Sequence, residues 1–210
     1  MFGMKAEIAL REKGLSFDRV MVPYSGEKGY SPKHEDVLRI NPKKQVPVLT
    51  DGDLEIFDST QIFEYLEDIA PTPALWPAAP ADRARARQLE LTADEIYFPH
   101  VFTVMMNYGN EDESIQESAR EELRTVYRQL EPKLDSQEYL SGAFSFADIA
   151  FFMAQVFGDR HGAPITGSTP NLLAWRDRVA ARPSVRPVMQ ELGAYLTENG
   201  RPVPDFIAGL

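Results

Sequence analysis

The dipeptide Val46-Pro47 places a proline inside a run that otherwise reads as a β-strand. Proline lacks the N–H that a strand ladder needs, so it is confined to sheet edges, bulges and cis turns. We predict a cis peptide bond, which would leave the backbone N–H and C=O of Val46 free to pair with an extended peptide. An ordinary edge-strand proline is the alternative.

The motif Asp58-Ser59-Thr60 stands directly before apolar residues that recur at helical spacing over residues 62–69. A helix N-terminus presents unpaired N–H groups and the positive end of the helix dipole, which suits a carboxylate. The Ser59 hydroxyl adds a donor, and the Asp58 carboxylate can accept from an amine. Both residue types are also common N-caps, so capping alone is the alternative.

A polar and cationic loop, Asn41-Pro42-Lys43-Lys44-Gln45, leads into Val46. Its two lysines suit a second carboxylate, although such lysines are more often simply solvated. The three motifs follow one another closely, and their joint order is more specific than any one of them.

The elements that must position these motifs form a small α/β unit. They are, in order, helix 2–13 with Gly14 as its C-cap, strand 17–24, a short helix from Ser31-Pro32 to about Ile40, strands 46–50 and 54–57, and helix 62–69. Asp51-Gly52 between the last two strands is a hairpin signal, so we expect this pair to be antiparallel.

Four prolines between residues 71 and 80 mark a linker, and strand signals fade beyond it. We therefore predict a first domain over residues 1–70 and an all-helical domain over residues 81–210. Its expected features are long helices over 81–107 and 114–135 and N-caps at Thr169 and Ser184.

The clearest local signal of the second half is the capping-box spacing of Ser145 and Asp148. Phe144 and Ile149 stand at the hydrophobic-staple positions on either side of it. An apolar stripe then continues to Val156, which predicts a buried central helix with a fixed start.

Composition excludes several classes of function. The chain has 210 residues, 22 of them basic and 32 acidic, and the net charge of −10 disfavours nucleic acid and anionic membranes as partners. No apolar run approaches the roughly 20 residues that span a bilayer, and no secretory signal opens the chain. Cysteine is absent and the three histidines are scattered, so we expect no metal site and a cytoplasmic protein.

The string NPKKQVPVLTDGDLEIFDSTQIFEYLED is similar to the glutathione-binding core of the cytosolic glutathione S-transferase superfamily, with some features of its zeta-type and other bacterial members. IALREKGLSFDRV resembles the family's first helix and second strand, PTPALWP its interdomain linker, and YLSGAFSFADIAFF its capped core helix. The resemblance implies a thioredoxin-like N-terminal domain, an all-α C-terminal domain and a homodimer.

The same resemblance assigns binding roles. Val46, through cis-Pro47, would pair with the cysteinyl backbone of glutathione. Asp58 and Ser59 would hold its γ-glutamyl end, and Gln45 or Lys44 would lie near its glycyl end.

The chain departs from the family at its start. Members begin with a β-strand that ends in the Ser, Cys or Tyr that activates the glutathione sulfur, whereas this sequence opens at Met1-Phe2-Gly3-Met4, already inside the first helix. We expect a downstream start or a truncation, and the first strand is missing from the sequence given. No catalytic residue is assigned. Tyr24, Tyr97 and Tyr108 are the possible substitute donors.

An apolar stretch late in the first long helix faces the family's cleft by resemblance, and its expected pocket residues are Tyr97, Val101, Met105 and Tyr108. Such a stripe is otherwise core. The resemblance implies a transferase that adds glutathione to a small hydrophobic electrophile. The alternatives are a glutathione-dependent isomerase and a non-catalytic glutathione- or partner-binding protein.

Overall fold

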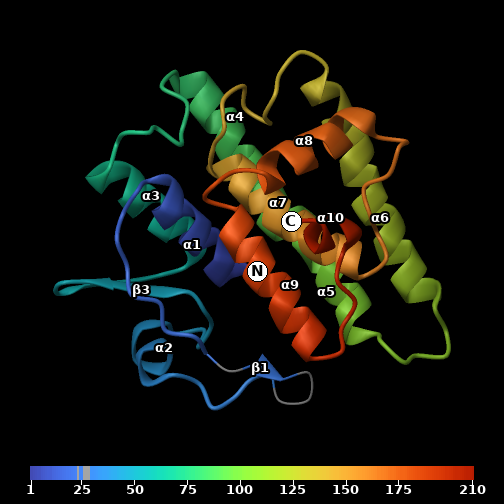
Figure 1. Cartoon of the computed structure of the whole chain (residues 1–210), viewed down its shortest axis with the longest axis horizontal. Coiled ribbons are helices and arrows are strands. Elements are labelled where there is room, and N and C mark those ends of the chain that lie inside the picture. Colours follow the sequence, from blue (N-terminus) through green and yellow to red (C-terminus); the bar gives the residue numbers. More distant parts are fainter. Residues whose placement is uncertain (23, 26–28) are drawn as a thin grey trace. The chain divides into compact units, whose positions relative to one another are not determined.

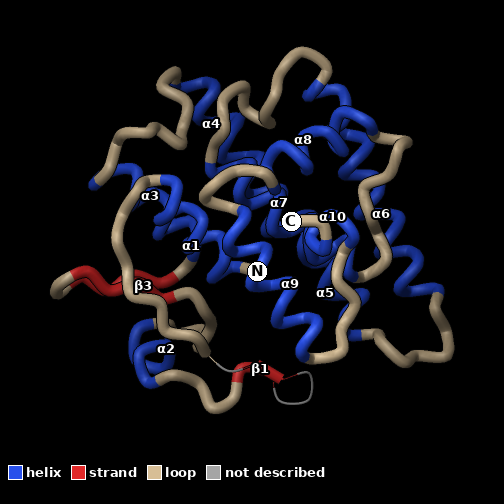
Figure 2. Tube along the Cα trace, viewed as in Figure 1, coloured by secondary structure: helices blue, strands red, loops and turns tan. Residues whose placement is uncertain are grey.

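The computed structural model describes residues 1–22, 24–25 and 29–210. The chain divides into two compact units, Met1–Pro73 and Ala74–Leu210 (Figure 1). All strands of the described residues belong to the first unit, and the second is helical apart from isolated β-bridges between Tyr139 and Ala143 (Figure 2).

The first unit mixes short strands with helices. Its elements are α1 (Phe2–Glu12), β1 (Tyr24–Ser25), β2 (Gly29–Tyr30), α2 (Glu35–Ile40), β3 (Val48–Asp51), β4 (Leu54–Phe57) and α3 (Ser59–Ile69). β1 pairs antiparallel with β2, and β3 pairs antiparallel with β4, as the hairpin signal predicts. The predicted first helix is also confirmed. It ends at Glu12, and the φ of 66° at Gly14 lets the chain turn back so that the Leu15 N–H donates to the Leu10 carbonyl.

Two predictions in this unit are wrong. Residues 17–22 form no strand, Pro23 lies outside the described residues, and β1 begins only at Tyr24. Alternation suits a strand but does not supply a partner, and the side chains of Val20 and Met21 are 67% and 62% exposed. The second helix begins at Glu35 instead of after Ser31-Pro32, because the His34 ring caps it by accepting from the Asp36 N–H at 3.2 Å.

A buried lysine ties α1 to the end of α3. The Lys13 ammonium donates to the Glu67 carboxylate at 2.6 Å and to the carbonyls of Ala70 and Pro73 at 2.7 Å each. A buried charge is tolerated only when it is paired and hydrogen-bonded, and these three acceptors meet that need. The two helices also share an apolar core that includes Ile8 and Phe63.

The second unit is a set of helices around one buried helix. Its elements are α4 (Pro80–Leu91), the π-helix η1 (Thr92–Tyr97), α5 (Phe98–Met106), α6 (Ser114–Leu130), the 3₁₀ turn η2 (Glu131–Leu134), α7 (Phe146–Arg160), α8 (Pro170–Ala180), α9 (Arg186–Glu198) and α10 (Asp205–Ala208). α7 is the central helix, and it packs against α4, η1, α5 and α8.

Prolines explain how the two predicted long helices differ from uniform α-helices. The first is helical throughout, but it widens into a π-turn just before Pro99, where the Phe98 N–H donates to the Ala93 carbonyl. A proline has no N–H for the carbonyl four residues earlier, and the wider turn accommodates that loss. The second becomes a 3₁₀ turn at Glu131, next to Pro132.

The predicted capping box is confirmed, and its carboxylate does more than cap. Asp148 is buried and accepts from the backbone and hydroxyl of Ser145, from the Leu140 N–H and from the Trp175 indole, all at 2.9 Å. Burial raises the pKa of Asp148, while these donors favour its charged form. One side chain therefore joins the 140s loop, α7 and α8.

The remaining caps differ from the simple prediction. Thr169 is the N-cap residue of α8, but the carboxylate of Glu131 receives the N–H groups of Asn171 and Leu172, at 2.9 and 2.8 Å. The N-cap of α9 is Val185, one residue after the predicted Ser184.

Gly158 in α7 lies so close to two buried tyrosines that a larger residue would collide with them. The hydroxyls of Tyr97 and Tyr127 lie 2.5 Å apart, and Tyr127 donates to the Ala163 carbonyl at 2.8 Å. α7 passes this pair at Gly158, where an added Cβ would lie 1.8 Å from the Tyr97 hydroxyl oxygen.

We predict that Gly158→Ala destabilises the protein by about 1–3 kcal/mol, because the methyl group displaces the buried tyrosine pair. Denaturant unfolding measures the loss. Gly167→Ala is the matched control, since a Cβ there meets nothing within 4 Å. In the Tyr97→Phe background, Gly158→Ala should lower the free energy of unfolding by less. An unchanged loss would show that contact with the Tyr97 hydroxyl does not cause the destabilisation.

Candidate functional site

The β3–β4 register brings the first two sequence motifs together. Val48 pairs with Phe57 at the end of the ladder, and the chain continues one residue outward on each side to Pro47 and Asp58. Val46 and Ser59 come next. Because the strands are antiparallel, these two residues lie at the same open end of the hairpin.

The predicted cis peptide bond between Val46 and Pro47 is confirmed. Both residues are half-buried. β3 begins directly after Pro47, so the backbone of Val46 lies beyond the ladder.

Asn41 shapes the loop that precedes this dipeptide, and the sequence analysis did not give it that role. Its buried amide donates to the Gln45 carbonyl at 2.7 Å, and its oxygen accepts from the Lys43 N–H at 2.9 Å. The side chains of Lys44 and Gln45 are exposed, and Lys44 has a φ of 55°. An Asn-Pro pair ahead of a loop was the available signal, since asparagine side chains often bond their own backbone two residues on.

Asp58 is the N-cap of α3 and Ser59 is its first residue. One oxygen of Asp58 accepts from the N–H groups of Thr60 and Gln61 at 3.0 and 3.4 Å. Its φ of 77° is a conformation that non-glycine residues seldom adopt, and such strain is concentrated at functional sites. Ser59 is 2% exposed, and among the described residues nothing accepts from its hydroxyl or N–H.

The four residues expected to line an electrophile pocket differ in exposure. Tyr97 and Val101 are fully buried, Met105 is half-buried, and Tyr108 is 59% exposed. The Tyr97 ring packs on Phe151 inside the helical unit. A pocket role for these residues stays a prediction.

The candidate activating hydroxyls are distinguished by their surroundings. Burial, together with Tyr127, raises the pKa of Tyr97 well above its usual value, so that Tyr97 is a poor source of phenolate. The side chain of Tyr24 lies outside what the structure describes. Residues 1–4, at the start of α1, carry neither a hydroxyl nor a thiol.

Tyr108 is held by a buried histidine. Its hydroxyl lies 2.8 Å from Nδ1 of His161, and the carbonyl of His161 accepts from Nε of Arg120 at 3.0 Å. Burial, with the nearby cations Arg160 and Arg120, lowers the pKa of His161 to about 4. The neutral ring can therefore accept the Tyr108 proton at physiological pH.

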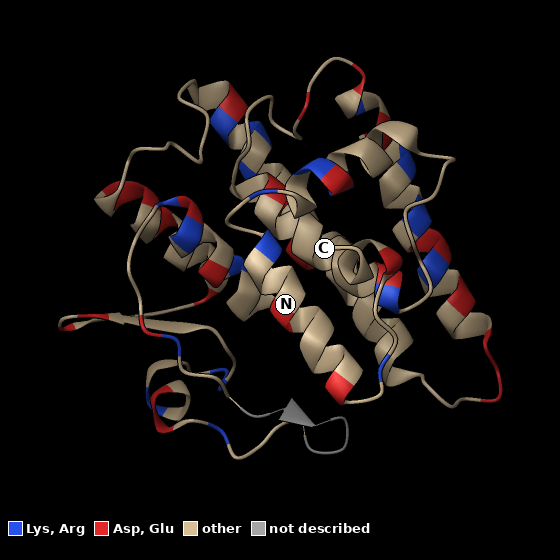
Figure 3. Cartoon of the chain, viewed as in Figure 1, with Lys and Arg blue, Asp and Glu red and all other residues tan. Residues whose placement is uncertain are grey.

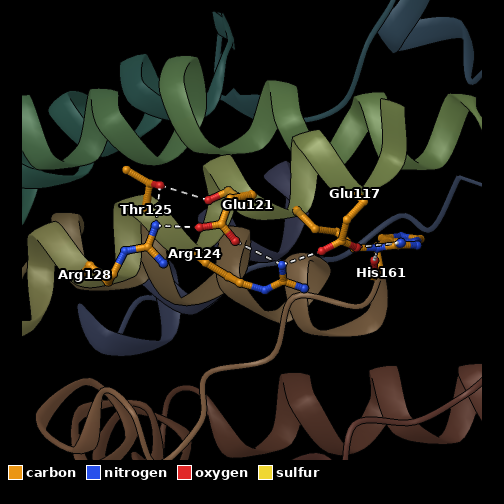
Figure 4. Close-up of polar contacts among 7 residues, drawn as sticks. Glu117, Glu121, Arg124, Thr125, Arg128 and His161 are labelled. Carbon is orange, nitrogen blue, oxygen red and sulfur yellow. Dashed lines mark hydrogen bonds and ion pairs between the residues drawn. The ribbon is translucent and has the colours of Figure 1, made fainter. Parts of the chain in front are cut away.

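An ion-pair ladder runs along α6 toward this histidine (Figure 4). Arg124 joins Glu117 at 2.7 Å and Glu121 at 3.2 Å, and Arg128 joins Glu121 at 2.7 Å. Figure 3 shows the resulting alternation of acidic and basic residues along the helix. These exposed pairs orient side chains and contribute little stability.

Within the described residues, no group of three or more His, Asp or Glu side chains could hold a metal ion. No helix among them is long and apolar enough to cross a membrane.

Comparison with known proteins decides the family. The model of the glutathione S-transferase N-terminal domain matches residues 1–74, and the model of the C-terminal domain matches residues 94–183. The chain belongs to the glutathione S-transferase superfamily. It therefore has the superfamily's fold, a small thioredoxin-like N-terminal domain and an all-helical C-terminal domain.

Curated relatives of this chain differ in their names. Probable glutathione S-transferase GSTF1 of Oryza sativa is 29% identical and covers 92% of this chain and 91% of its own. Protein LigF of Sphingobium is 31% identical and covers 90% of this chain and 89% of its own. A stringent starvation protein A homolog of Histophilus somni is 27% identical, covering 93% and 74%.

Solved structures agree with this assignment. A glutathione S-transferase from Rhodospirillum rubrum matches with a TM-score of 0.76 and 28% identity, over 89% of this chain and 86% of that one. A theta-class glutathione S-transferase from Xanthomonas axonopodis, solved with glutathione bound, matches with a TM-score of 0.72 and 26% identity, over 89% of this chain and 90% of that one. The beta-etherase LigF matches with a TM-score of 0.76 and 26% identity, over 90% and 94%.

We predict that the burial of His161 beside Arg160 and Arg120 makes stability fall on acidification. Unfolded histidine takes up a proton near pH 6.5, whereas folded His161 does so only near pH 4. The unfolded state binds more protons between these values, so the free energy of unfolding falls by up to about 3 kcal/mol as the pH drops through this window.

Urea unfolding at pH 7 and pH 4 measures this fall. In His161→Gln the fall should be smaller, and in the control His100→Gln it should equal that of the parent. An equal fall in all three proteins would contradict the assignment.

Proposed function

We propose that this protein binds glutathione at the open end of the β3–β4 hairpin and adds its sulfur to a small hydrophobic electrophile. The observation that carries the proposal is Ser59. It is a buried residue at a helix N-terminus, its hydroxyl and N–H have no acceptor among the described residues, and it lies at the same open end of the hairpin as Val46. Two unused donors at a helix N-terminus suit one ligand carboxylate.

Each end of glutathione has a proposed partner. The N–H and C=O of Val46, which lie beyond the ladder, pair with the cysteinyl backbone. Ser59 binds the γ-glutamyl carboxylate, and the second oxygen of Asp58 accepts from the γ-glutamyl amine. Gln45 and Lys44, which project from the loop that Asn41 closes, lie toward the glycyl carboxylate.

The reaction needs the thiolate of glutathione, because a free thiol with a pKa near 8.5 is mostly protonated at neutral pH. The proton passes to solvent, and the sulfur then forms a bond to the electrophilic carbon. In a substitution that carbon releases its leaving group as an anion, such as the chloride of chlorodinitrobenzene, and in an addition the π electron pair moves to the neighbouring atom, which takes a proton from solvent. The positive end of the α1 dipole favours the thiolate. On the helical unit, Tyr108 and Met105 are the exposed and half-exposed members of the predicted pocket, and we propose that they contact the electrophile, with Tyr97 and Val101 behind them.

A non-catalytic glutathione-binding protein is the second candidate. The mixed set of relatives supports it, since they include a stringent starvation protein A homolog as well as transferases. Two other glutathione-dependent reactions would use the same binding site. One is a reaction on an ether, as the name beta-etherase indicates for LigF, and the other is an isomerisation. We further propose that the protein acts in the cytoplasm, in keeping with a chain without cysteine.

We propose that the protein is a homodimer. Four large apolar side chains of α4, η1 and α5, which we propose form one apolar row, are 51–67% exposed: Leu91, Ile96, Phe102 and Met106. Four large apolar side chains in one row are more than a monomer surface usually leaves uncovered.

We predict that Ser59→Ala weakens glutathione binding by roughly 10- to 150-fold, the value of a hydrogen bond to a charged group. Because Asp58 is the cap of α3, alanine at the first helical position removes the hydroxyl and keeps the helix. Isothermal titration calorimetry measures the affinity. Thr60→Ala, one residue further along α3, is the matched control and should bind like the parent.

Parent-like affinity in Ser59→Ala would remove Ser59 from the site. Turnover of chlorodinitrobenzene then separates the two candidate functions. Binding with turnover supports the transferase, and binding without turnover of any electrophile tested supports the non-catalytic protein.

We predict that Phe102→Glu converts the dimer into monomers, because a charge in the apolar row opposes its burial. Sedimentation equilibrium should give twice the chain mass of 23.7 kDa for the parent and one chain mass for the variant. Ala194→Glu adds the same charge on the exposed side of α9 and should stay dimeric. A monomeric parent at micromolar concentration would contradict the proposal.

A further inference from the structure

The turn that follows α5 carries Tyr108, and the end of α7 carries its partner, His161. The Tyr108 hydroxyl lies 2.8 Å from Nδ1 of His161, and the two rings are tilted by 56° with their centroids 5.4 Å apart. Tyr108 is 59% exposed, whereas His161 is only 9% exposed. A ring in the interior therefore holds a hydroxyl that lies at the surface.

Helix α6 fixes both partners. One turn apart on this helix, Gln116 donates its amide to the Asn107 carbonyl, and Arg120 donates Nε to the His161 carbonyl at 3.0 Å. Gly162 permits the second contact, because its φ is 88° and an added Cβ would lie 2.9 Å from Nε of Arg120. The same helix thus holds the turn that carries the hydroxyl and the turn that carries the ring.

The hydrogen bond between the two side chains runs from the tyrosine to the histidine. Burial and two nearby cations lower the pKa of His161 to about 4, so the ring is neutral at physiological pH and has one acceptor nitrogen. A phenol, with a pKa near 10, is a far stronger acid than the N–H of a neutral imidazole, which favours O–H donation to Nδ1. Nε2 then carries the ring proton, and it is not one of the buried atoms that lack a partner in the described part of the chain.

This direction determines what Tyr108 offers to a molecule outside the helical unit. A tyrosine hydroxyl has a single proton, and here it points to His161. The oxygen keeps its lone pairs for the solvent side, where it can only accept. A tyrosine without such a partner could turn its proton to a carbonyl or nitro oxygen, and His161 removes that choice.

We propose that His161 makes Tyr108 a hydrogen-bond acceptor, and that the site therefore selects electrophiles that carry a hydroxyl or N–H group. His161 is the positioning residue, and Tyr108 is the residue that contacts the electrophile. The inference rests on the proposed function, which places Tyr108 against the electrophile. It narrows the substrate class from small hydrophobic electrophiles in general to those that also bear a phenol, alcohol or amide N–H.

The probes are the 3- and 4-isomers of S-(hydroxybenzyl)glutathione and of S-(methoxybenzyl)glutathione. In each conjugate the group that an electrophile would contribute is already bonded to the sulfur, so the test needs no turnover. Isothermal titration calorimetry measures their affinities. We expect at least one hydroxybenzyl conjugate to bind roughly 2- to 12-fold more tightly than its methoxybenzyl counterpart, the net value of one neutral hydrogen bond.

The matched protein variants are Tyr108→Phe and His161→Phe. Tyr108→Phe removes the acceptor, so the ratio of the two affinities should fall to about one, whereas simple exclusion of the larger methoxy group would leave the ratio unchanged. His161→Phe keeps a ring but frees the Tyr108 proton, so the methoxybenzyl conjugate should gain affinity and the ratio should also fall. His100→Phe makes the same exchange at a half-buried histidine of α5, and it should keep the ratio of the parent.

The outcomes separate this inference from the proposed function. Glutathione binding with equal affinities for hydroxybenzyl and methoxybenzyl conjugates would overturn the inference and leave the proposed function standing. A preference that persists in Tyr108→Phe would also overturn it. If neither glutathione nor any conjugate binds, the proposed function fails, and the inference fails with it.

Nitrogen NMR of the parent chain keeps the test decisive if His161→Phe does not fold. At neutral pH the ¹⁵N shifts of His161 should show a proton on Nε2 and none on Nδ1. A proton on Nδ1 would reverse the direction of the hydrogen bond and overturn the proposal.

Discussion

The two-residue turn at Gly52 and Asp53 sets the register on which the candidate site depends. With only two residues in the turn, Asp51 must face Leu54, and every later pair follows. Val46 and Ser59 then come to the same end of the hairpin, although twelve residues lie between them in the chain. A slip of one residue would exchange the two faces of β3 and move Val46 away from the start of α3.

Two further constraints keep that end of the hairpin usable. Pro47 cannot donate to a ladder, so pairing stops before Val46, and Asp58 takes up a strained backbone to cap α3. Because Asp58 satisfies the N–H groups of Thr60 and Gln61, only the donors of Ser59 stay open for a ligand.

The helical unit depends in a similar way on one buried carboxylate. Asp148 receives bonds from three separate parts of the chain, and removing a partner from a buried charge is costly. Glu131 acts comparably at the surface, because its position after the last turn of α6 lets it cap α8. These contacts explain how an acidic, helix-rich unit keeps a fixed arrangement.

Much of this arrangement could be predicted from local sequence. The hairpin turn, the cap of α3, the cis-proline and the capping box at Ser145 all involve residues a few positions apart, where spacing determines the contacts. The errors lie where the outcome depends on distant partners. Residues 17–22 alternate like a strand but pair with no strand in the part of the chain that the structure describes, and Glu131 caps a helix forty residues away. The role of Asn41 was missed because its signal is one side chain folding back on its own loop.

Titration of the ¹⁵N-labelled protein with glutathione, followed by amide chemical shifts, tests the central claim most directly. If the ligand binds at the open end of the hairpin, the largest shifts should be at Val46 and Ser59, with smaller ones at Gln45 and Thr60. Shifts confined to residues 74–210, or none at millimolar glutathione, would contradict the account.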